Sequence, residues 1–259
     1  MSAGAVVGVS AGDGGKKQPA ETDLARKERL KTLVFMHMAS NVTLSLLVNN
    51  PRTQRLNEMF KGDKAQVAST LSWWASSVGL TEFIVNPTVG ALSDTYGRRP
   101  FMLMSPLLSA VLKCASGGTS SLTVMALEKI LCDGLRTISG TTMATTCLTD
   151  LCTPDEMGDM RGVLFQWAGL GIVGGPFITG QIIRMSGNQR IPFFLSAAIA
   201  ALQFVVELFY LEETLPASLR KPYTGFVNPF EFHRLFSSTP LLRQCSTTLG
   251  IQNLLEPKN

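Results

Sequence analysis

Several ionisable or strongly polar side chains lie inside apolar segments of the chain. The set consists of His37, Asn41, Glu82, Asp133 and Arg136. Such groups are expensive to bury in an apolar phase, and they mark either a pathway or an internal pair. A carboxyl at that depth, such as that of Glu82, is a candidate for proton exchange. These five residues are therefore the candidate contacts for a small solute or a proton.

Asp133 has two interpretations. Lys129 precedes it by four residues and Arg136 follows it by three, which are the spacings of neighbours on one helix face. Asp133 is either half of a neutralising structural pair or part of a solute or proton site. His37 and Asn41 are one helical turn apart, so they are expected to line the same face.

Six apolar segments carry these side chains. Hydrophobic residues make up 45% of the 259 residues and charged residues 16%, with a mean hydropathy of +0.20. A spanning helix needs about 20 mostly apolar residues, and the connections are too short to cover a soluble core. We therefore predict an all-α polytopic membrane protein with six transmembrane helices. The predicted spans are Thr32–Val48, Ser69–Leu92, Pro100–Ser116, Leu122–Leu148, Gly162–Arg184 and Ile191–Leu211.

The distribution of basic residues predicts the orientation. With an even number of spans both ends lie on one side, which carries 14 Lys and Arg residues against 6 on the other. The richer side is expected to face the cytoplasm. Residues 1–31 are predicted to be a disordered cytoplasmic tail and residues 32–216 a six-helix transmembrane domain. Residues 217–259 are predicted to be a cytoplasmic loop and the truncated start of a seventh helix.

Two further charged residues, Lys113 and Glu207, lie near the ends of their predicted spans. Long charged side chains at such positions extend to the lipid headgroups while their stems stay in the apolar phase. We expect both side chains to do so, with a place in an intramembrane pathway or pair as the alternative for Glu207.

The sequence gives no indication of an enzyme. The five cysteines show no C-x-x-C spacing, and no serine or cysteine lies in a nucleophile motif. No metal or cofactor is expected. The net charge of +4 is sorted by topology rather than gathered in one patch, so nucleic acid is not an expected partner. The expected partners are the lipid bilayer and a small-molecule solute.

The densest motif, GALSDTYGRRP, lies between the second and third predicted spans and begins at Gly90. Asp94 and Arg98 are four residues apart, so they can pair on a helix. Gly97 permits a backbone turn that a residue with a Cβ would strain. Gly90 is expected to let a helix end approach a neighbour closely.

This loop resembles the signature loop of the major facilitator superfamily, roughly G-x-L-(A/S)-D-(R/K)-x-G-R-(R/K), which joins that family's second and third helices. Seven positions match, the last two being Arg98 and Arg99, and Thr95 replaces the usual basic residue. The two arginines are also expected to hold the loop in the cytoplasm.

Two other segments resemble the same family. Asp150, followed by Thr-Pro-Asp-Glu and Arg161, is similar to the link between the fourth and fifth helices. Glu213-Thr-Leu-Pro216 is similar to the end of the family's N-terminal half. The resemblance extends over roughly residues 33–216, and it implies a gating role for the loop residues Gly90, Asp94, Gly97, Arg98, Arg99, Asp150 and Arg161.

The fifth predicted span resembles the G-x-x-x-G-P-x-x-G-G element of the superfamily's antiporters. Its matching residues are Gly171, Gly175, Pro176 and Gly180, with Thr179 in place of one glycine. Glycines four apart allow another helix to approach closely, and the proline allows a bend. Ordinary small-residue packing without an antiporter meaning remains an alternative for this element.

The resemblance implies one half of a major facilitator fold, built as two inverted three-helix repeats over residues 32–116 and 122–211. In that family a second six-helix half follows, and the solute binds between the halves. The chain is therefore expected to be a truncated protein or the N-terminal half of one, with a second half as a possible partner. The family's usual basic residue of the fourth helix corresponds to either Lys129 or Arg136.

The implied function is transport of a small organic solute, as proton-coupled antiport. The resemblance is greatest to the drug/proton antiporter or tetracycline-resistance branch. The alternative is a non-transporting six-helix membrane protein that associates with full-length transporters and modulates them.

Overall fold

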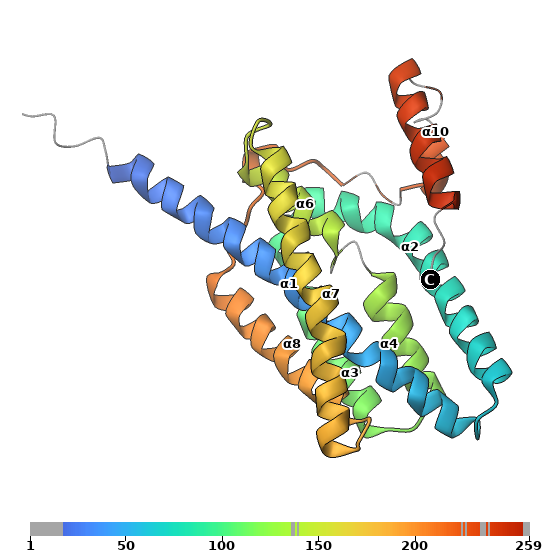
Figure 1. Ribbon diagram of the computed structural model, residues 1–259. Helices are drawn as coiled ribbons and strands as arrows, with labels where there is room; N and C mark the ends of the chain where they lie inside the picture. Colours follow the sequence, from blue (N-terminus) through green and yellow to red (C-terminus); the bar gives the residue numbers. More distant parts are fainter. Residues whose placement is uncertain are drawn as a thin grey trace, which may run out of the picture.

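The chain folds into a bundle of long helices (Figure 1). The computed structural model describes residues 18–255 except 136, 137, 139, 224, 226, 234–236 and 238. Its elements are α1 (Gln18–Met59), α2 (Lys64–Tyr96), α3 (Arg99–Gly118), α4 (Leu122–Gly134), α6 (Thr141–Leu151), α7 (Met157–Ser186), α8 (Ile191–Tyr210), η1 (Ala217–Leu219), η2 (Pro229–His233) and α10 (Pro240–Leu255). In Figure 1 α10 stands apart from the bundle.

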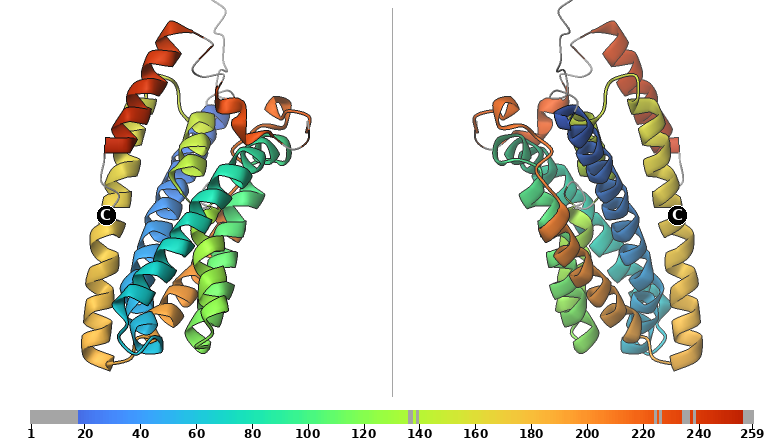
Figure 2. Two further views of the ribbon diagram at one scale, coloured as in Figure 1. Left: turned by 90° about the vertical axis from the view of Figure 1, so that its right-hand side faces the viewer. Right: turned by 90° about the vertical axis from the view of Figure 1, so that its left-hand side faces the viewer.

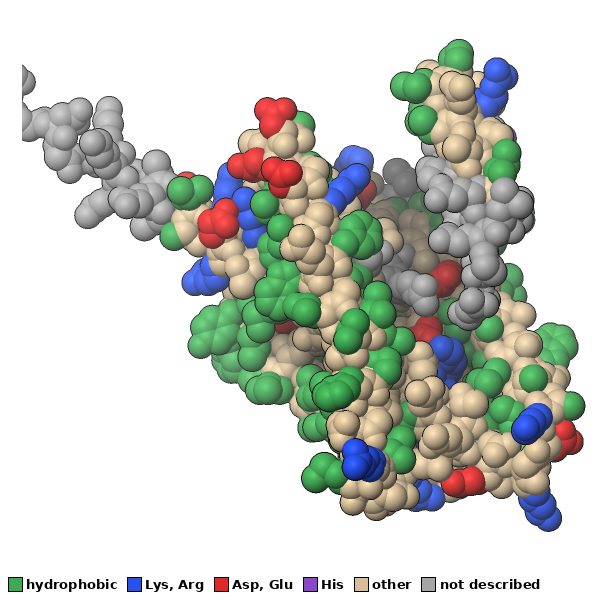
Figure 3. Space-filling model, in the orientation of Figure 1, with side chains coloured by type: hydrophobic (Ala, Val, Ile, Leu, Met, Phe, Trp, Pro, Cys, Tyr) green, Lys and Arg blue, Asp and Glu red, His purple; other side chains and the backbone are tan. Residues whose placement is uncertain are grey.

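Four helices of the described part are long and apolar enough to cross a membrane. They are α1 from Asp23 onward, α3, α7 and α8. α2 is long enough but carries many Ser and Thr residues together with Glu82, and α4 and α6 are each too short. Hydrophobic side chains are spread over the side of the bundle, and most charged ones gather towards its two ends (Figure 3).

The first helix begins earlier than expected. α1 starts at Gln18, so the prediction of a disordered tail over residues 1–31 is wrong for residues 18–31. The stretch from Leu24 to Leu30 consists of Leu, Ala, Arg, Lys and Glu, which are the strongest helix formers. Residues 1–17 lie outside the described part of the chain.

The fourth predicted span, Leu122–Leu148, is broken. It forms α4, which ends at Gly134, and α6, which begins at Thr141, and residues 136, 137 and 139 between them lie outside the described part of the chain. Glycine is the poorest helix former apart from proline. Thr141 and Thr142 then begin α6, and β-branched residues also disfavour a continuous helix.

The connections alternate between the two ends of the bundle, as Figure 2 shows. At one end, Arg26 and Arg29 of α1 pair with Glu212, which follows α8. At the other end, Gln189 donates to Glu58 at 2.9 Å, which joins the α7–α8 connection to α1. After every two crossings of the bundle, the chain is therefore back at the end where α1 begins.

Helix contacts follow a regular pattern. α1 packs against α7 and α8, α2 packs against α4, and α3 packs against α8 and α4. Exchanging α1, α2 and α3 with α4, α7 and α8 converts four of these five pairs into one another and leaves the α3–α8 pair unchanged. Two equivalent three-helix units would make the same contacts.

The close approach of α7 to α1 depends on two glycines. A Cβ at Gly171 would lie 2.9 Å from the Ala39 carbonyl oxygen, and a Cβ at Gly175 would lie 2.8 Å from the Leu46 Cβ. Gly180 has no such neighbour, so the expectation that it contributes to a packed face is wrong. Its side of α7 is exposed.

A hydrogen bond also joins these two helices. Pro51 has no N–H, so the Leu47 carbonyl lacks its helical donor. Thr179 Oγ1 of α7 donates to that carbonyl at 2.8 Å. The residue that replaces a glycine of the family motif thereby satisfies a backbone group that an apolar phase would leave unpaired. Pro176 lies within α7, on its exposed side.

Candidate functional site

A polar cavity of about 320 Å³ lies between α1, α3, α4 and α7. Its polar lining comes from Asn41 and Ser45 of α1, Ser109 and Lys113 of α3, and Cys132 and Asp133 of α4, and its apolar lining is Met38, Val42, Leu46 and Ile172. Figure 3 shows charged side chains in the hollow between α7 and α4. The cavity brings two of the predicted site residues, Asn41 and Asp133, together.

Asp133 forms the ion pair that its spacing to Lys129, one turn earlier on α4, predicted, and its role at a solute or proton site stays a prediction. Its carboxylate also lines the cavity, where Ser45 Oγ of α1 donates to Oδ1 at 3.5 Å. Arg136, the other predicted neighbour, lies outside the described residues.

Lys113 does not extend to the headgroups, so that expectation is wrong. Its side chain is 3% exposed, and Nζ donates to the Leu44 carbonyl of α1 at 3.0 Å. The reason is its helix face, because Ser105, Ser109 and Lys113 recur at intervals of four and all are buried. This polar stripe is the sequence signal that could have identified Lys113 as a cavity residue.

His37 and Asn41 do not share one site. Asn41 donates to the His37 carbonyl at 2.8 Å and accepts from Ser105 Oγ at 2.9 Å beside the cavity. The His37 ring is fully buried between α1 and α8, where Nδ1 lies 2.8 Å from Glu207 Oε1. Gln203 Nε2 donates to the same carboxylate oxygen at 2.7 Å.

Glu207 was expected to extend to the headgroups, and that expectation is also wrong. The residue is 3% exposed. Ser196, Ala200, Gln203 and Glu207 follow helical spacing along α8 and are all buried against the bundle. The polar stripe on α8 is again the signal that could have identified this residue.

Glu82 lies at a different cavity. That space, about 590 Å³, is bounded by Glu82, Asn86 and Pro87 of α2 together with Thr142 and Pro229. Glu82 is half-buried. The structure therefore separates the two predicted carboxyl candidates, placing Asp133 and Glu82 at different openings of the bundle.

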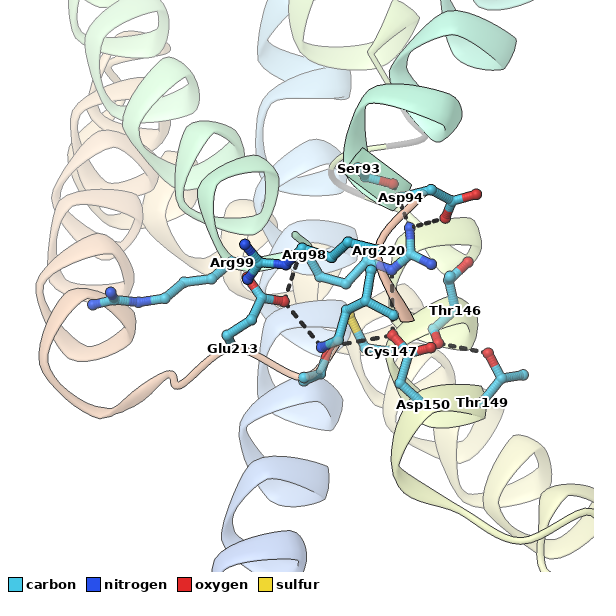
Figure 4. Close-up of polar contacts among 12 residues, drawn as sticks. Ser93, Asp94, Arg98, Arg99, Thr146, Cys147, Thr149, Asp150, Glu213 and Arg220 are labelled. Atoms are coloured by element: carbon cyan, nitrogen blue, oxygen red, sulfur yellow. Dashed lines mark hydrogen bonds and ion pairs between the residues drawn. The ribbon is translucent and has the colours of Figure 1, made fainter. Parts of the chain in front are cut away.

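The loop between α2 and α3 forms a compact charge cluster (Figure 4). Arg98 is 6% exposed. Its Nη1 lies 2.6 Å from Asp94 Oδ1, the predicted pair, and donates to Ser93 Oγ at 2.5 Å. Its Nε lies 3.3 Å from Asp150 Oδ2 of α6. One guanidinium thus joins the end of α2 to the end of α6.

Glu213 belongs to this cluster, although we did not select it from the sequence as a site residue. The backbone N–H of Arg98 donates to Glu213 Oε1 at 2.8 Å, and that of Arg99 donates to Oε2 at 3.3 Å. A carboxylate at the start of α3 satisfies free N–H groups and favours the helix dipole. Its position in the matched E-T-L-P segment was the available signal.

Two glycines of the loop differ from each other. Gly97 has φ +100°, and a Cβ there would lie 2.1 Å from Glu213 Oε2, so the predicted need for glycine is confirmed. Gly90 has no atom within 4 Å of its Cβ position, so the predicted close packing at Gly90 is wrong. Gly90 instead bounds the cavity beside Glu82.

The remaining loop residues lie at the edges of the cluster. Arg99 Nη2 donates to the Leu208 carbonyl at 2.8 Å, which ties α3 to the end of α8. Arg161 is exposed near the start of α7. Nearby, the hydrogen bond from Arg26 is the main reason that the pKa of the Glu212 carboxyl is below its ordinary value.

Comparison with known proteins agrees with this architecture. The sequence matches the family model of the Major Facilitator Superfamily over residues 33–254. It is 32% identical over 151 residues to the tetracycline resistance protein, class E, of Escherichia coli, covering 58% of this chain and 36% of that protein. It is 30% identical over 208 residues to citrate exporter 1 of Yarrowia lipolytica, covering 78% of this chain and 30% of that protein.

A third relative and a solved structure extend the comparison. Multidrug resistance protein 2 of Bacillus subtilis is 25% identical over 168 residues, covering 63% of this chain and 40% of that protein. The fold matches the human organic anion transporter MFSD10 (TETRAN) with a TM-score of 0.63 and 19% identity, over 76% of this chain and 50% of that chain.

The matched segment spans about a third of the length of the curated relatives. The family match covers most of the chain and includes the loop cluster and the cavity helices. The chain is thus a multi-pass membrane protein that belongs to the Major Facilitator Superfamily.

Proposed function

We propose that this bundle is one half of a secondary transporter that moves a small organic solute through the cavity between α1, α3, α4 and α7. The observation that carries the proposal is the group of polar and charged side chains at Asn41, Lys113 and Asp133 inside a bundle with apolar sides. Intramembrane ionisable residues mark substrate and ion pathways. The names of relatives for tetracycline resistance, multidrug resistance and citrate export point to small organic solutes.

The proposed half contains six crossings arranged as two inverted repeats, with α4 and α6 together as the fourth crossing. The exchangeable helix contacts and the alternating connections support this arrangement. The excess of Lys and Arg at the end that holds the loop cluster supports a cytoplasmic position for that end and for the N-terminus. Residues 32–216 then form the transmembrane domain.

A second six-helix body is proposed to face the cavity. Alternating access needs two bodies that move about a central site, and this body lies either in a continuation of the chain or in another copy. The loop cluster would act as a gate at the cytoplasmic end, with Arg98 holding α2 and α6 together in one state.

Proton coupling is proposed to use one of three carboxyls. Asp133 lines the solute cavity and pairs with Lys129. Glu207 lies against the buried His37 ring of α1, with Glu207 Oε1 2.8 Å from His37 Nδ1. Glu82 lies at the second opening. The Glu207–His37 contact joins two titratable groups from different helices, so proton binding there would alter the packing of α1 against α8.

The test is solute flux in proteoliposomes with an imposed pH gradient. Tetracycline and citrate are the probe solutes, and flux is compared for Asp133→Asn, Glu207→Gln and Glu82→Gln. Glu58→Gln, an exposed carboxyl in the last turn of α1, is the matched control. With another copy of the chain as the second body, we expect gradient-driven flux in the unaltered chain and a loss of at least tenfold in the variant that lacks the proton-carrying carboxyl.

Flux that does not depend on the pH gradient would remove the coupling claim. Unchanged flux in all three variants would rule out Asp133, Glu207 and Glu82 as the residues that bind the proton. Absence of any flux, with co-purification of a full-length relative, would support the alternative of a non-transporting modulator.

A further inference from the structure

Lys113 is a buried cation at the cavity wall, and its ammonium forms no ion pair with a carboxylate of the described residues. Its Nζ donates to the Leu44 carbonyl at 3.0 Å. Within the described part of the chain, no Asp or Glu oxygen forms an ion pair with it, whereas the buried Arg52 and the half-buried Lys129 each have one. An ammonium has three N–H donors, and the Leu44 carbonyl accepts one of them.

The surrounding charges do not compensate Lys113. Arg52 and Glu128 form a buried pair at 2.6 Å, and Lys129 pairs with Asp133. These four charges cancel in two pairs. Among the described residues around the cavity, Lys113 therefore contributes an excess of one positive charge when it is protonated.

An uncompensated buried ammonium is expensive in an apolar phase, and a bound anion would remove much of that cost. Such a pair would be strong because solvent screening is weak in a buried site. The position of Lys113 at the cavity wall makes the ammonium accessible to a ligand in the cavity.

The rest of the lining indicates the shape of that ligand. Met38, Val42, Leu46 and Ile172 provide an apolar wall, and Ser109 lies one turn from Lys113 on the same face of α3. The polar remainder of the lining includes Asn41, Ser45 and Asp133, whose carboxylate is paired with Lys129. A volume of about 320 Å³ is at the lower end for small-molecule sites. The cavity therefore suits a compact apolar body with one anionic group.

We propose that Lys113 binds the carboxylate of the transported solute, so that the substrate class is a small organic acid with an apolar body. This inference rests on the proposed function, because it takes the cavity to be the solute site. Lys113 supplies the charge, Ser109 supplies a hydroxyl donor, and the α1 and α7 side chains contact the apolar body.

The test is binding to the full chain in lipid nanodiscs, measured by calorimetry. The probes are 2-naphthoate and 2-naphthamide, which share a ring system and differ in charge. Empty nanodiscs correct for partition into lipid. We expect the acid to bind at least tenfold more tightly than the amide.

The key variants are Lys113→Met and Lys113→Gln. Both should fold, because Ser196 Oγ also donates to the Leu44 carbonyl, at 3.2 Å, and removing a buried charge is not itself costly. We expect the preference for the acid to fall below about threefold in both, and Lys113→Arg to keep a preference. Cys114→Ala, at the exposed neighbouring position, is the matched control and should retain the full preference.

Equal binding of acid and amide to the unaltered chain would overturn the inference, as would an undiminished preference in Lys113→Met and Lys113→Gln. The two proposals can fail separately. Preferential binding of naphthoate through Lys113 without any proteoliposome flux supports the inference and removes the proposed function. Flux of other solutes without a preference for the acid supports the proposed function and overturns the inference.

Discussion

The loop cluster and the cavity both bury charge, but they balance it differently. In the loop cluster Arg98 has two carboxylate partners, Asp94 and Asp150, and Glu213 accepts backbone N–H groups. In the cavity Lys113 has a carbonyl oxygen as its partner. A balanced cluster holds helix ends together, whereas an unbalanced one leaves interaction energy for a ligand. On this difference we base the proposal that the loop cluster is a structural latch and the cavity a binding site.

The largest effect is expected from Arg98→Met. It leaves Asp94 and Asp150 close together without their shared cation, and breaking a buried pair in this way costs about 3 kcal/mol. We expect that loss in the free energy of unfolding in detergent micelles. Arg99→Met removes a bond to one carbonyl and should cost much less. Equal effects of the two substitutions would show that the cluster is not a latch.

The latch can be loosened without removing charge. Gly97→Ala places a methyl group at φ +100° and against the Glu213 carboxylate. Strain of this kind costs about 2 kcal/mol, and Glu213 must move away from the start of α3. Hydrogen exchange of the Arg98 and Arg99 amides should accelerate. Gly90→Ala, where space is open, is the control and should leave that exchange unchanged.

These two regions also differ in how far the sequence predicts them. Asp94 and Arg98 are neighbours on one helix turn, so spacing alone identifies their pair. Lys113 and Glu207 lie near segment ends, which indicated headgroup contact, but helix rotation turns them inward. Rotation is set by packing between helices distant in sequence. The polar stripes on α3 and α8 carry that information more reliably than depth does.

Local sequence patterns also failed to predict the break between α4 and α6 and the contacts of Glu213. The sequence stays apolar from Leu122 to Leu148, so hydropathy does not indicate that α4 ends at Gly134 or that α6 begins after Gly140. Glu213 reaches the start of α3 across more than a hundred residues of sequence. Fold class and the loop pair were predictable because they depend on composition and local spacing.

A smaller difference in stability is expected between substitutions at two glycines of α7, the helix that forms one wall of the cavity. Gly171→Ala forces a methyl group against the α1 backbone at 2.9 Å and should destabilise by about 1 kcal/mol. Gly174→Ala meets no atom within 4 Å and should stabilise the helix slightly, because alanine is the better helix former. Thermal unfolding in micelles measures both. A shift of the same sign for both would contradict the close approach of α7 to α1.

The smallest effect concerns pH at the outer edge of the loop cluster. Because Arg26 and Arg29 lower the pKa of Glu212, its contribution to stability is present above about pH 4.5 and is lost as pH falls through the lowered value. Proteolysis at the start of α1 should stay constant from pH 7 to about pH 4.5 and increase as the pH falls below that value. Glu212→Gln should abolish that pH difference. An identical pH response in the variant would contradict the tether.

The most direct test of the account is to fill the cavity. Ser45 and Met36 both lie on α1, the first at the cavity and the second exposed on the side of the bundle. We predict that Ser45→Phe lowers gradient-driven solute flux in proteoliposomes at least tenfold, while Met36→Phe leaves it unchanged. Undiminished flux through the Ser45→Phe protein would contradict the claim that solute passes through this cavity.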